Sequence, residues 1–218
     1  MIHLRFFDIS KITEEDALRL LNLLPGSIRN EIMRYKLLKD QRLMLMGRLM
    51  VREFFLGSGF HWHLFNKTEN GKPYVKGMQC FNISHSGNIV IVAFSLFDIG
   101  IDIELKREID FNSVVDYIHP LEKAEFLYSN NYTDSFFKIW TRKEAFLKAK
   151  GNGIVDGLNE YNCLQNIVND GVFKWEIAEL HILHDYSVAV CQKAPIEAID
   201  ICEMSLDEFL GNPLPERY

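Results

Sequence analysis

The sequence predicts a mixed α/β protein of the α+β kind, built from two halves of similar secondary structure. In the first half and again in the second, helical patterns are followed by strand-like runs, although no repeat is visible in the sequence itself. The 218 residues are 48% hydrophobic and 25% charged, enough to bury a substantial core. We place the division between the halves after residue 101, giving an N-terminal half over 1–101 and a C-terminal half over 102–218.

The N-terminal half begins with a predicted strand over residues 2–8. Thr13 and the three acidic residues after it predict a helix start, and Pro25-Gly26 predicts its end. A long helical pattern then runs from about Ser27 to Leu56, with an interruption near Lys39-Asp40. This helical pattern contains several basic residues. Such charges are also typical of an ordinary solvated helix surface.

A turn and a polar loop follow these helices. Asn70-Gly71-Lys72-Pro73 is a turn signal, and residues 80–83 predict a strand that leads directly into Ser84-His85-Ser86-Gly87. Such a loop offers hydroxyls, an imidazole and backbone N–H groups to an anion. Since neither a nucleophile-elbow motif nor an acid partner is evident, the sequence favours a phosphate-binding loop over a hydrolase site.

Two apolar strands over residues 89–105 organise the chain. In the second of them, apolar residues alternate with Gly100, Asp102 and Glu104, so both carboxylates project from the same face. Two carboxylates in this arrangement repel each other unless water, a basic side chain or a cation lies between them. Mg²⁺ suits such oxygen ligands, and a solvated strand face is the alternative interpretation.

The C-terminal half continues with a helical stretch from about Phe111, a turn at His119-Pro120 and a long helix from about Thr133 to Lys150. Gly151-Asn152-Gly153 predicts the end of that helix. The polar tail over 205–218 is assigned no chemistry. Strand-like runs are predicted near residues 161–164, 172–180, 187–191 and 197–201.

The long helix places Trp140, Glu144 and Lys148 along one stripe, four residues apart. An ordinary surface ion pair and a core tryptophan are the alternatives. Because apolar residues surround most of this helix, we expect it to be largely buried. A buried glutamate beside Lys143 and Lys148 needs a partner or a metal ion.

Composition excludes several classes of protein. The net charge of −6 argues against a general nucleic-acid binder. No signal-peptide pattern and no membrane-length apolar run is present, so a cytoplasmic location without a membrane partner is the expectation. Neither zinc nor disulfides are indicated by the four widely spaced cysteines, Cys80, Cys163, Cys191 and Cys202.

Three motifs together resemble those of the Sfp-type 4′-phosphopantetheinyl transferases. They are Asn82-Ile83-Ser84-His85-Ser86, Ile99 to Glu104, and Trp140-Thr141-Arg142-Lys143-Glu144 continuing through Lys148 to Gly151 and Gly153. Gly71-Lys72-Pro73 matches a further element, so the resemblance covers about residues 70–153. It implies two similar α/β halves in a pseudo-twofold arrangement with the active site between them.

The resemblance implies transfer of the 4′-phosphopantetheine arm of coenzyme A to a serine of an acyl or peptidyl carrier protein, with release of 3′,5′-ADP. By position, Asp102, Glu104 and Glu144 match the magnesium ligands. Coenzyme A contacts are implied for Lys39, Arg42, Lys72, Ser84, His85, Lys143 and Lys148. The length suggests a monomer.

The chemistry of a pyrophosphate diester agrees with these assignments, because transfer needs charge neutralisation, alignment and an activated hydroxyl. Lys148 is suited to stabilise the leaving phosphate. Glu144 is the candidate base, directly or through a metal-bound water molecule. Glu122 is the alternative, because the resemblance aligns it with a glutamate considered for a similar role in the family. Two other functions stay open: a silent module that binds coenzyme A or a carrier, and a different Mg²⁺-dependent phosphate-ester enzyme.

Overall fold

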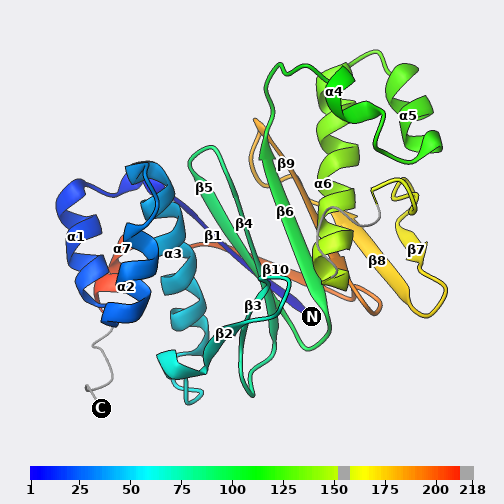
Figure 1. Ribbon diagram of the computed structural model, residues 1–218. Coiled ribbons are helices and arrows are strands. Elements are labelled where there is room, and N and C mark those ends of the chain that lie inside the picture. The colour runs from blue at the N-terminus through cyan, green and yellow to red at the C-terminus, as the bar shows by residue number, and fades with distance from the viewer. Residues whose placement is uncertain (152–157, 212–218) are drawn as a thin grey trace.

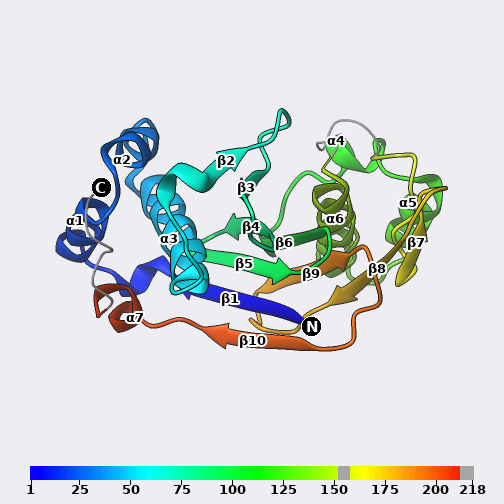
Figure 2. The same ribbon diagram turned by 90° about the horizontal axis from the view of Figure 1, so that it is seen from below.

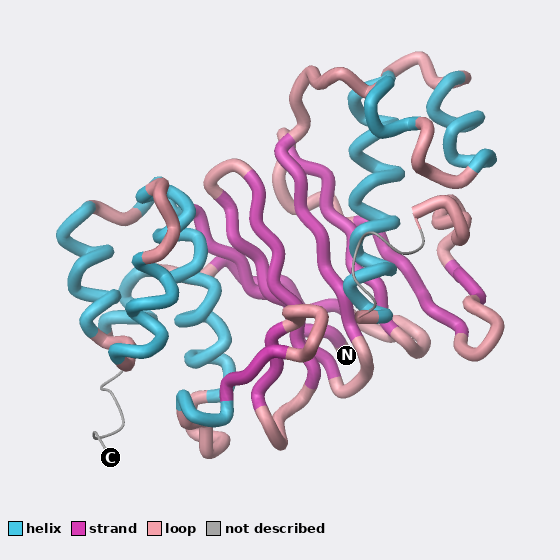
Figure 3. Tube along the Cα trace, in the orientation of Figure 1, coloured by secondary structure: helices cyan, strands magenta, loops and turns pink. Residues whose placement is uncertain are grey.

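The computed structural model describes residues 1–151 and 158–211 (Figure 1). Two four-stranded sheets lie side by side, with a separate two-stranded hairpin near the boundary between them (Figures 1 and 2). Figure 3 shows the strands in the middle of the molecule and the helices gathered in two groups beyond them. The mixed α+β class with two α/β halves is confirmed.

The first sheet has the strand order β10-β1-β5-β4. Its outer face packs against α1, α2 and α3, and β10 runs parallel to β1 while the other pairs are antiparallel. The elements are β1 (Ile2–Asp8), α1 (Glu14–Asn22), α2 (Gly26–Met33), α3 (Leu38–Phe55), β4 (Cys80–Ser86), β5 (Ile89–Ser95), β10 (Ile199–Glu203) and α7 (Leu206–Leu210). The hairpin consists of β2 (Phe65–Lys67) and β3 (Pro73–Val75).

The second sheet has the order β6-β9-β8-β7, all antiparallel. The long helix α6 covers its outer face, where Ala145 and Phe146 pack against Ala189 and Cys191. The elements are β6 (Ile99–Leu105), α4 (Asn112–Val115), α5 (Pro120–Leu127), α6 (Tyr132–Lys150), β7 (Ile167–Asn169), β8 (Lys174–Glu179) and β9 (Tyr186–Gln192).

An apolar layer joins the two sheets. Ile99, Ile101 and Ile103 of β6 are fully buried against residues of β1 and β5. Asp102 and Glu104 alternate with these isoleucines, so their side chains lie on the other face of β6. This is the pattern of a strand with one face in the apolar core. Gly100 is required on that other side, because a Cβ atom there would overlap the backbone of Ala145 and Ala149 in α6.

The chain crosses the predicted division of the halves twice. β6 begins at Ile99, before residue 101, and β10 returns from the end of the chain to pair with β1. Within the tail that is assigned no chemistry, residues 206–210 form α7, whose Phe209 is fully buried in the core of the first half. The boundary at 101 stays a prediction about domains: the second sheet comes from the continuous stretch 99–192, whereas the first sheet combines strands from both ends of the chain.

Several local predictions are corrected. The helical pattern from Ser27 to Leu56 is broken between Met33 and Leu38, earlier than Lys39-Asp40. The predicted loop at 84–86 is the end of β4, and the turn comes at Gly87, where φ is +57°. Residues 161–164 do not form a strand, because their backbone groups bind side chains of α5 and α6 instead of another strand.

The predicted start of the first helix is confirmed. Thr13 caps α1 in a reciprocal capping box with Asp16, in which the Asp16 amide lies 3.1 Å from Thr13 Oγ1. All four cysteines are free thiols. No helix within 1–151 or 158–211 is both long and apolar enough to cross a membrane. Of the predicted helix stop, Gly151 takes a left-handed cap conformation with φ +78°, while Asn152 and Gly153 lie outside the described residues.

Candidate active site

A pocket of about 280 Å³ opens where β4, β6 and α6 meet. Its walls combine side chains from all three of the motifs found in the sequence. They are Ile83, Ser84 and His85 from β4, Asp102 and Glu104 from β6, and Trp140, Glu144 and Lys148 from α6. The predicted stripe on the long helix is confirmed, since its three members line one pocket.

Asp102 is the most enclosed carboxylate of this pocket, with 2% of its surface exposed. Its Oδ1 atom accepts hydrogen bonds from Lys148 Nζ at 2.5 Å and from Ser84 Oγ at 2.9 Å. Its Oδ2 atom is buried and has no hydrogen-bond partner among the described residues. Burial raises the pKa of Asp102, and the neighbouring Lys148 opposes that shift.

Glu104 and Glu144 complete an acidic group. Glu104 Oε2 accepts a hydrogen bond from Ser86 Oγ at 2.7 Å, and burial together with the charge of Asp102 raises its pKa. Burial raises the pKa of Glu144 to about 7, and the charges of Asp102 and Glu104 add to the effect while Lys148 opposes it. Like Asp102 Oδ2, Glu144 Oε1 is buried without a partner in the described part of the chain.

Two basic side chains border the carboxylates. Lys148 lies within hydrogen-bond distance of both Asp102 and Ser84, whose Oγ is 3.2 Å from its Nζ. His85 projects from the opposite side of β4 to Ser84 and Ser86, and burial and the charge of Lys148 lower its pKa. The imidazole is therefore mainly neutral at pH 7, while Lys148 supplies the positive charge beside the carboxylates.

The pocket fits a small hard cation by the chemistry of its donors. Three carboxylates face one lysine, and two buried carboxylate oxygens lack a hydrogen-bond partner in the described part of the chain. An unpaired buried oxygen is costly, and a hard cation with oxygen ligands relieves that cost. In this conformation, no three Asp, Glu, His or Cys side chains of the described ranges lie together in an arrangement that could hold a metal ion. In this conformation the Lys148 ammonium neutralises Asp102.

Lys143 and Glu122 lie elsewhere. Their side chains form a fully buried ion pair with a 2.9 Å separation on the other side of α6. Lys143 also donates to the Tyr161 carbonyl at 2.6 Å, while Glu122 accepts from the amides of Cys163 and His119 at 2.7 and 3.1 Å. Since these contacts occupy both groups, the geometry does not bring either to the pocket that holds Glu144.

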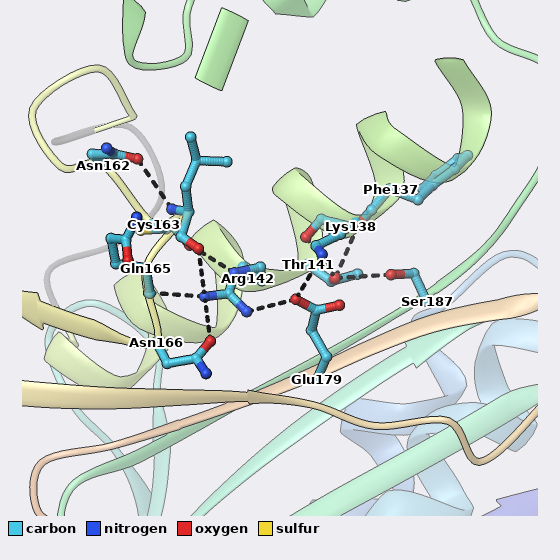
Figure 4. Close-up of polar contacts among 11 residues, drawn as sticks. Phe137, Lys138, Thr141, Arg142, Asn162, Cys163, Gln165, Asn166, Glu179 and Ser187 are labelled. Carbon is cyan, nitrogen blue, oxygen red and sulfur yellow. Dashed lines mark hydrogen bonds and ion pairs between the residues drawn. The ribbon is translucent and has the colours of Figure 1, made fainter. Parts of the chain in front are cut away.

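Arg142, which the sequence did not single out, extends this buried network (Figure 4). Its guanidinium donates to the carbonyls of Cys163 and Gln165 at 2.6 and 2.8 Å and to Glu179 Oε1 at 2.7 Å. These contacts attach the segment after residue 158 to α6. An arginine inside a mostly apolar helix was the only sequence signal for them.

Lys72 binds protein backbone. Its Nζ donates to the carbonyls of Ile99 and Lys148 at 3.0 and 2.8 Å, and Asn70 Nδ2 donates to the Gly151 carbonyl at 2.9 Å. The β2–β3 connection thus caps the carboxyl end of α6, the helix that carries Lys148. Burial lowers the pKa of Lys72, which also lines a larger neighbouring cavity of about 780 Å³.

Lys39 and Arg42, the implied coenzyme A contacts of the long helical pattern in the N-terminal half, do not line the pocket. Lys39 is exposed in the first turn of α3. Arg42 lines a groove with Leu18 of α1 and Met33 of α2. Neither residue lines the pocket around Asp102. Their predicted contact with the nucleotide stays a prediction.

The sequence also missed the role of Ser86. Its hydroxyl contacts Glu104, and Ser84 makes the corresponding contact with Asp102. The signal was present in the spacing, because residues two apart on a strand share a face. The interpretation of residues 84–87 as a loop concealed it.

Two protein-family models match this chain and together cover most of it. Residues 98–191 match the model of the 4′-phosphopantetheinyl transferase superfamily, and residues 11–96 match the model of a 4′-phosphopantetheinyl transferase N-terminal region. The 4′-phosphopantetheinyl transferase gsp of Aneurinibacillus migulanus is 29% identical over 91% of this chain and 91% of its own length.

Two further relatives span different shares of the chain. The 4′-phosphopantetheinyl transferase Sfp of Bacillus subtilis is 28% identical over 91% of this chain and 95% of its own length. The L-aminoadipate-semialdehyde dehydrogenase-phosphopantetheinyl transferase of Schizosaccharomyces pombe is 30% identical over 60% of each chain. With its motifs gathered in one pocket and both halves matched, this chain belongs to the 4′-phosphopantetheinyl transferase superfamily, as a member of the Sfp type.

Proposed function

We propose that this enzyme transfers the 4′-phosphopantetheine arm of coenzyme A to a serine hydroxyl of an acyl or peptidyl carrier protein, in a Mg²⁺-dependent reaction. The observation that carries the proposal is a pair of buried oxygens, Asp102 Oδ2 and Glu144 Oε1, that have no partner in the part of the chain that the structure describes. They lie in a pocket that also contains Lys148. The family membership supplies the substrate class.

Asp102, Glu104 and Glu144 would hold the metal ion, because they are the oxygen donors of the pocket. When bound, Mg²⁺ supplies neutralisation and alignment of the pyrophosphate charge. The chain contributes fixed donors around the same charge: Lys148 beside the carboxylates, and His85 on the rim of the pocket.

The transfer step balances as a substitution at phosphorus. The serine oxygen of the carrier forms a bond to the phosphorus that bears the pantetheine arm, and the bond from that phosphorus to the leaving 3′,5′-ADP oxygen breaks. Glu144 takes the proton of the serine hydroxyl, directly or through a water molecule, since it lines the pocket where that hydroxyl would lie. Lys148 stabilises the negative charge that builds up on 3′,5′-ADP.

Glu144 is preferred to Glu122 as the base. Both oxygens of Glu122 accept hydrogen bonds from backbone amides, and Lys143 neutralises its charge in a fully buried site. A base must reach the proton that it removes. Glu144 lines the pocket and retains one oxygen that has no partner among the residues of 1–151 and 158–211.

The test is the intact mass of a panel of apo carrier proteins after incubation with the enzyme, coenzyme A and Mg²⁺. We expect a gain of one phosphopantetheine arm on at least one carrier, and no gain after chelation of the metal. Coenzyme A binding without a mass gain on any carrier would replace the proposal with a silent binding module. Release of 3′,5′-ADP from an unchanged carrier would indicate a different phosphate-ester enzyme.

Location and assembly complete the proposal. A cytoplasmic monomer is the form expected from the sequence, with coenzyme A and the carrier as its partners and no nucleic acid. Light scattering of the purified chain should give a mass near 25.4 kDa. A mass two or three times larger would contradict the monomer.

A further inference from the structure

The two sheets meet at β4 and β6, and side chains take the place of backbone pairing at this seam. β6 pairs through its backbone with β9 on one edge. Along the other edge its amides donate to side chains of β4: Ile101 N to Asn82 Oδ1 at 2.9 Å, Ile103 N to Ser84 Oγ at 3.4 Å, and Leu105 N to Ser86 Oγ at 3.0 Å. We call Asn82, Ser84 and Ser86 the seam ladder.

The two serines of the seam ladder each make a second hydrogen bond. While Ser84 Oγ accepts from the Ile103 amide, it donates to Oδ1 of Asp102, the preceding residue. Ser86 Oγ accepts from the Leu105 amide and donates to Oε2 of Glu104 in the same way. A hydroxyl is able to do both at once, whereas a backbone amide only donates.

We infer that Ser86 is a positioning residue for Glu104, and that the seam ladder fixes the cation-binding carboxylates of β6 relative to the first half of the molecule. The inference rests on the proposed function, because it treats Asp102 and Glu104 as cation ligands. Groups that orient metal ligands are a recurrent part of metal sites.

Ser86 is a sharper test than Ser84. Asp102 is held by Lys148 as well as by Ser84, and Ser84 itself lines the pocket where substrate would lie. The hydrogen bond to Glu104 comes from Ser86, which is not part of the pocket wall. A change at Ser86 therefore alters the orientation of Glu104 without removing a group from the pocket.

A purely structural role for Ser86 is the competing explanation, and Ser95 provides the matched control. Ser95 also joins the two sheets, since its Oγ donates to Gln192 Oε1 at 2.5 Å and accepts from the Phe97 amide at 3.1 Å. It is buried and lies outside the pocket. Loss of either hydroxyl removes one hydrogen-bond donor and one acceptor, but of these two serines only Ser86 touches a carboxylate of the site.

The experiment compares Ser86→Ala, Ser86→Thr and Ser95→Ala in the full chain. Mg²⁺ affinity is measured by calorimetry with coenzyme A bound, together with the thermal unfolding temperature and the Mg²⁺ dependence of transfer. We expect Ser86→Ala to weaken Mg²⁺ binding about tenfold to a hundredfold. Ser86→Thr, which keeps the hydroxyl, should recover most of the loss, and Ser95→Ala should bind Mg²⁺ like the natural chain.

The outcomes separate the two claims. Unchanged Mg²⁺ affinity in Ser86→Ala, or equal weakening in Ser95→Ala, would overturn the positioning role while leaving the transferase intact. Absence of Mg²⁺ binding and of transfer in the natural chain would overturn the proposed function and this inference with it. Should Ser86→Ala fail to fold, Ser86→Cys carries the same expectation, because it preserves volume and replaces the hydroxyl by a weak donor.

Discussion

Two adjacent residues of α6, Lys143 and Glu144, are both buried and charged, yet they belong to opposite kinds of site. Lys143 has two partners, Glu122 and the Tyr161 carbonyl, and Glu122 is itself satisfied by two amides. Glu144 faces two other carboxylates and keeps a buried oxygen without a partner within the described residues. Successive residues of a helix point about 100° apart, so one helix serves both faces.

The difference teaches how to separate stability from function among buried charges. On the Lys143 face, every group named above is hydrogen-bonded, and Arg142 adds contacts to Cys163, Gln165 and Glu179 (Figure 4). A fully satisfied polar network rigidifies the fold. On the Glu144 face, burial raises the pKa of three carboxyl groups, and two buried oxygens have no partner among the described residues. Burying these groups raises the free energy of the folded protein until a cation or substrate binds.

The largest effect should come from Asp102→Asn. The substitution keeps the shape of the side chain and removes one charge from the proposed metal ligands. We expect the transfer rate to fall about a thousandfold, equivalent to about 4 kcal/mol in the barrier. The thermal unfolding temperature should stay unchanged or rise, because burial disfavours this carboxylate. A transfer rate above half that of the natural chain would contradict the assignment.

A substitution on the Lys143 face of α6 should lower the free energy of unfolding instead of the transfer rate. Lys143→Met leaves Glu122 buried without its counter-ion, and we expect the free energy of unfolding to fall by about 3 to 5 kcal/mol. Denaturant unfolding measures the change. The double variant Glu122→Gln, Lys143→Met removes both charges and should recover part of the loss. If Lys143→Met instead abolished transfer in a protein of natural stability, Lys143 would belong to the active site.

A smaller effect should follow from a substitution that shifts the whole of α6, with both of its faces, relative to β6. Gly100→Ala puts a methyl group against the backbone of α6 at Ala145 and Ala149, so the helix must shift away from β6. Overpacking of this kind costs about 1 to 3 kcal/mol. We expect transfer to fall as well, since Glu144 moves relative to Asp102. A Gly47→Ala variant is the comparison, because its Cβ meets only side chains of Ile83 and Val90.

The smallest effect, at most about 1.4 kcal/mol for each pH unit, is a pH dependence of stability in the metal-free protein. Glu144 has its pKa raised from 4.5 to about 7, so the folded protein holds a proton that the unfolded chain has released between these values. The free energy of unfolding therefore falls as pH rises through this window. Unfolding curves of the natural chain and of Glu144→Gln, measured from pH 4.5 to 8, should differ in this slope. Identical slopes would contradict the raised pKa.

The sequence predicted the parts of the site that depend on local periodicity. Alternation along residues 99–105 placed Asp102 and Glu104 on one face, and spacing by four placed Glu144 with Lys148. It did not separate Lys143 from Glu144, because the direction of each side chain depends on which elements pack against α6. Only the tertiary structure brings Glu122 and Tyr161 to the Lys143 side.

Longer-range features of the fold were beyond local patterns. The pairing of β10 with β1 joins residues at opposite ends of the chain, and nothing in either segment specifies the partner. The seam ladder was hidden for a related reason, since Ser84 and Ser86 read locally as loop residues. Their place in a strand becomes evident only when β5 pairs with β4.

The central claim is that the Glu144 face of α6 binds a cation and the Lys143 face does not. The most direct test is calorimetric titration of Mg²⁺ into the coenzyme A complexes of the natural chain, Glu144→Gln and Lys143→Met, at a temperature where all three are folded. Our account predicts binding to the natural chain and to Lys143→Met with similar affinity, and at least tenfold weaker binding to Glu144→Gln. Equal weakening in both variants, or undiminished binding to Glu144→Gln, would contradict it.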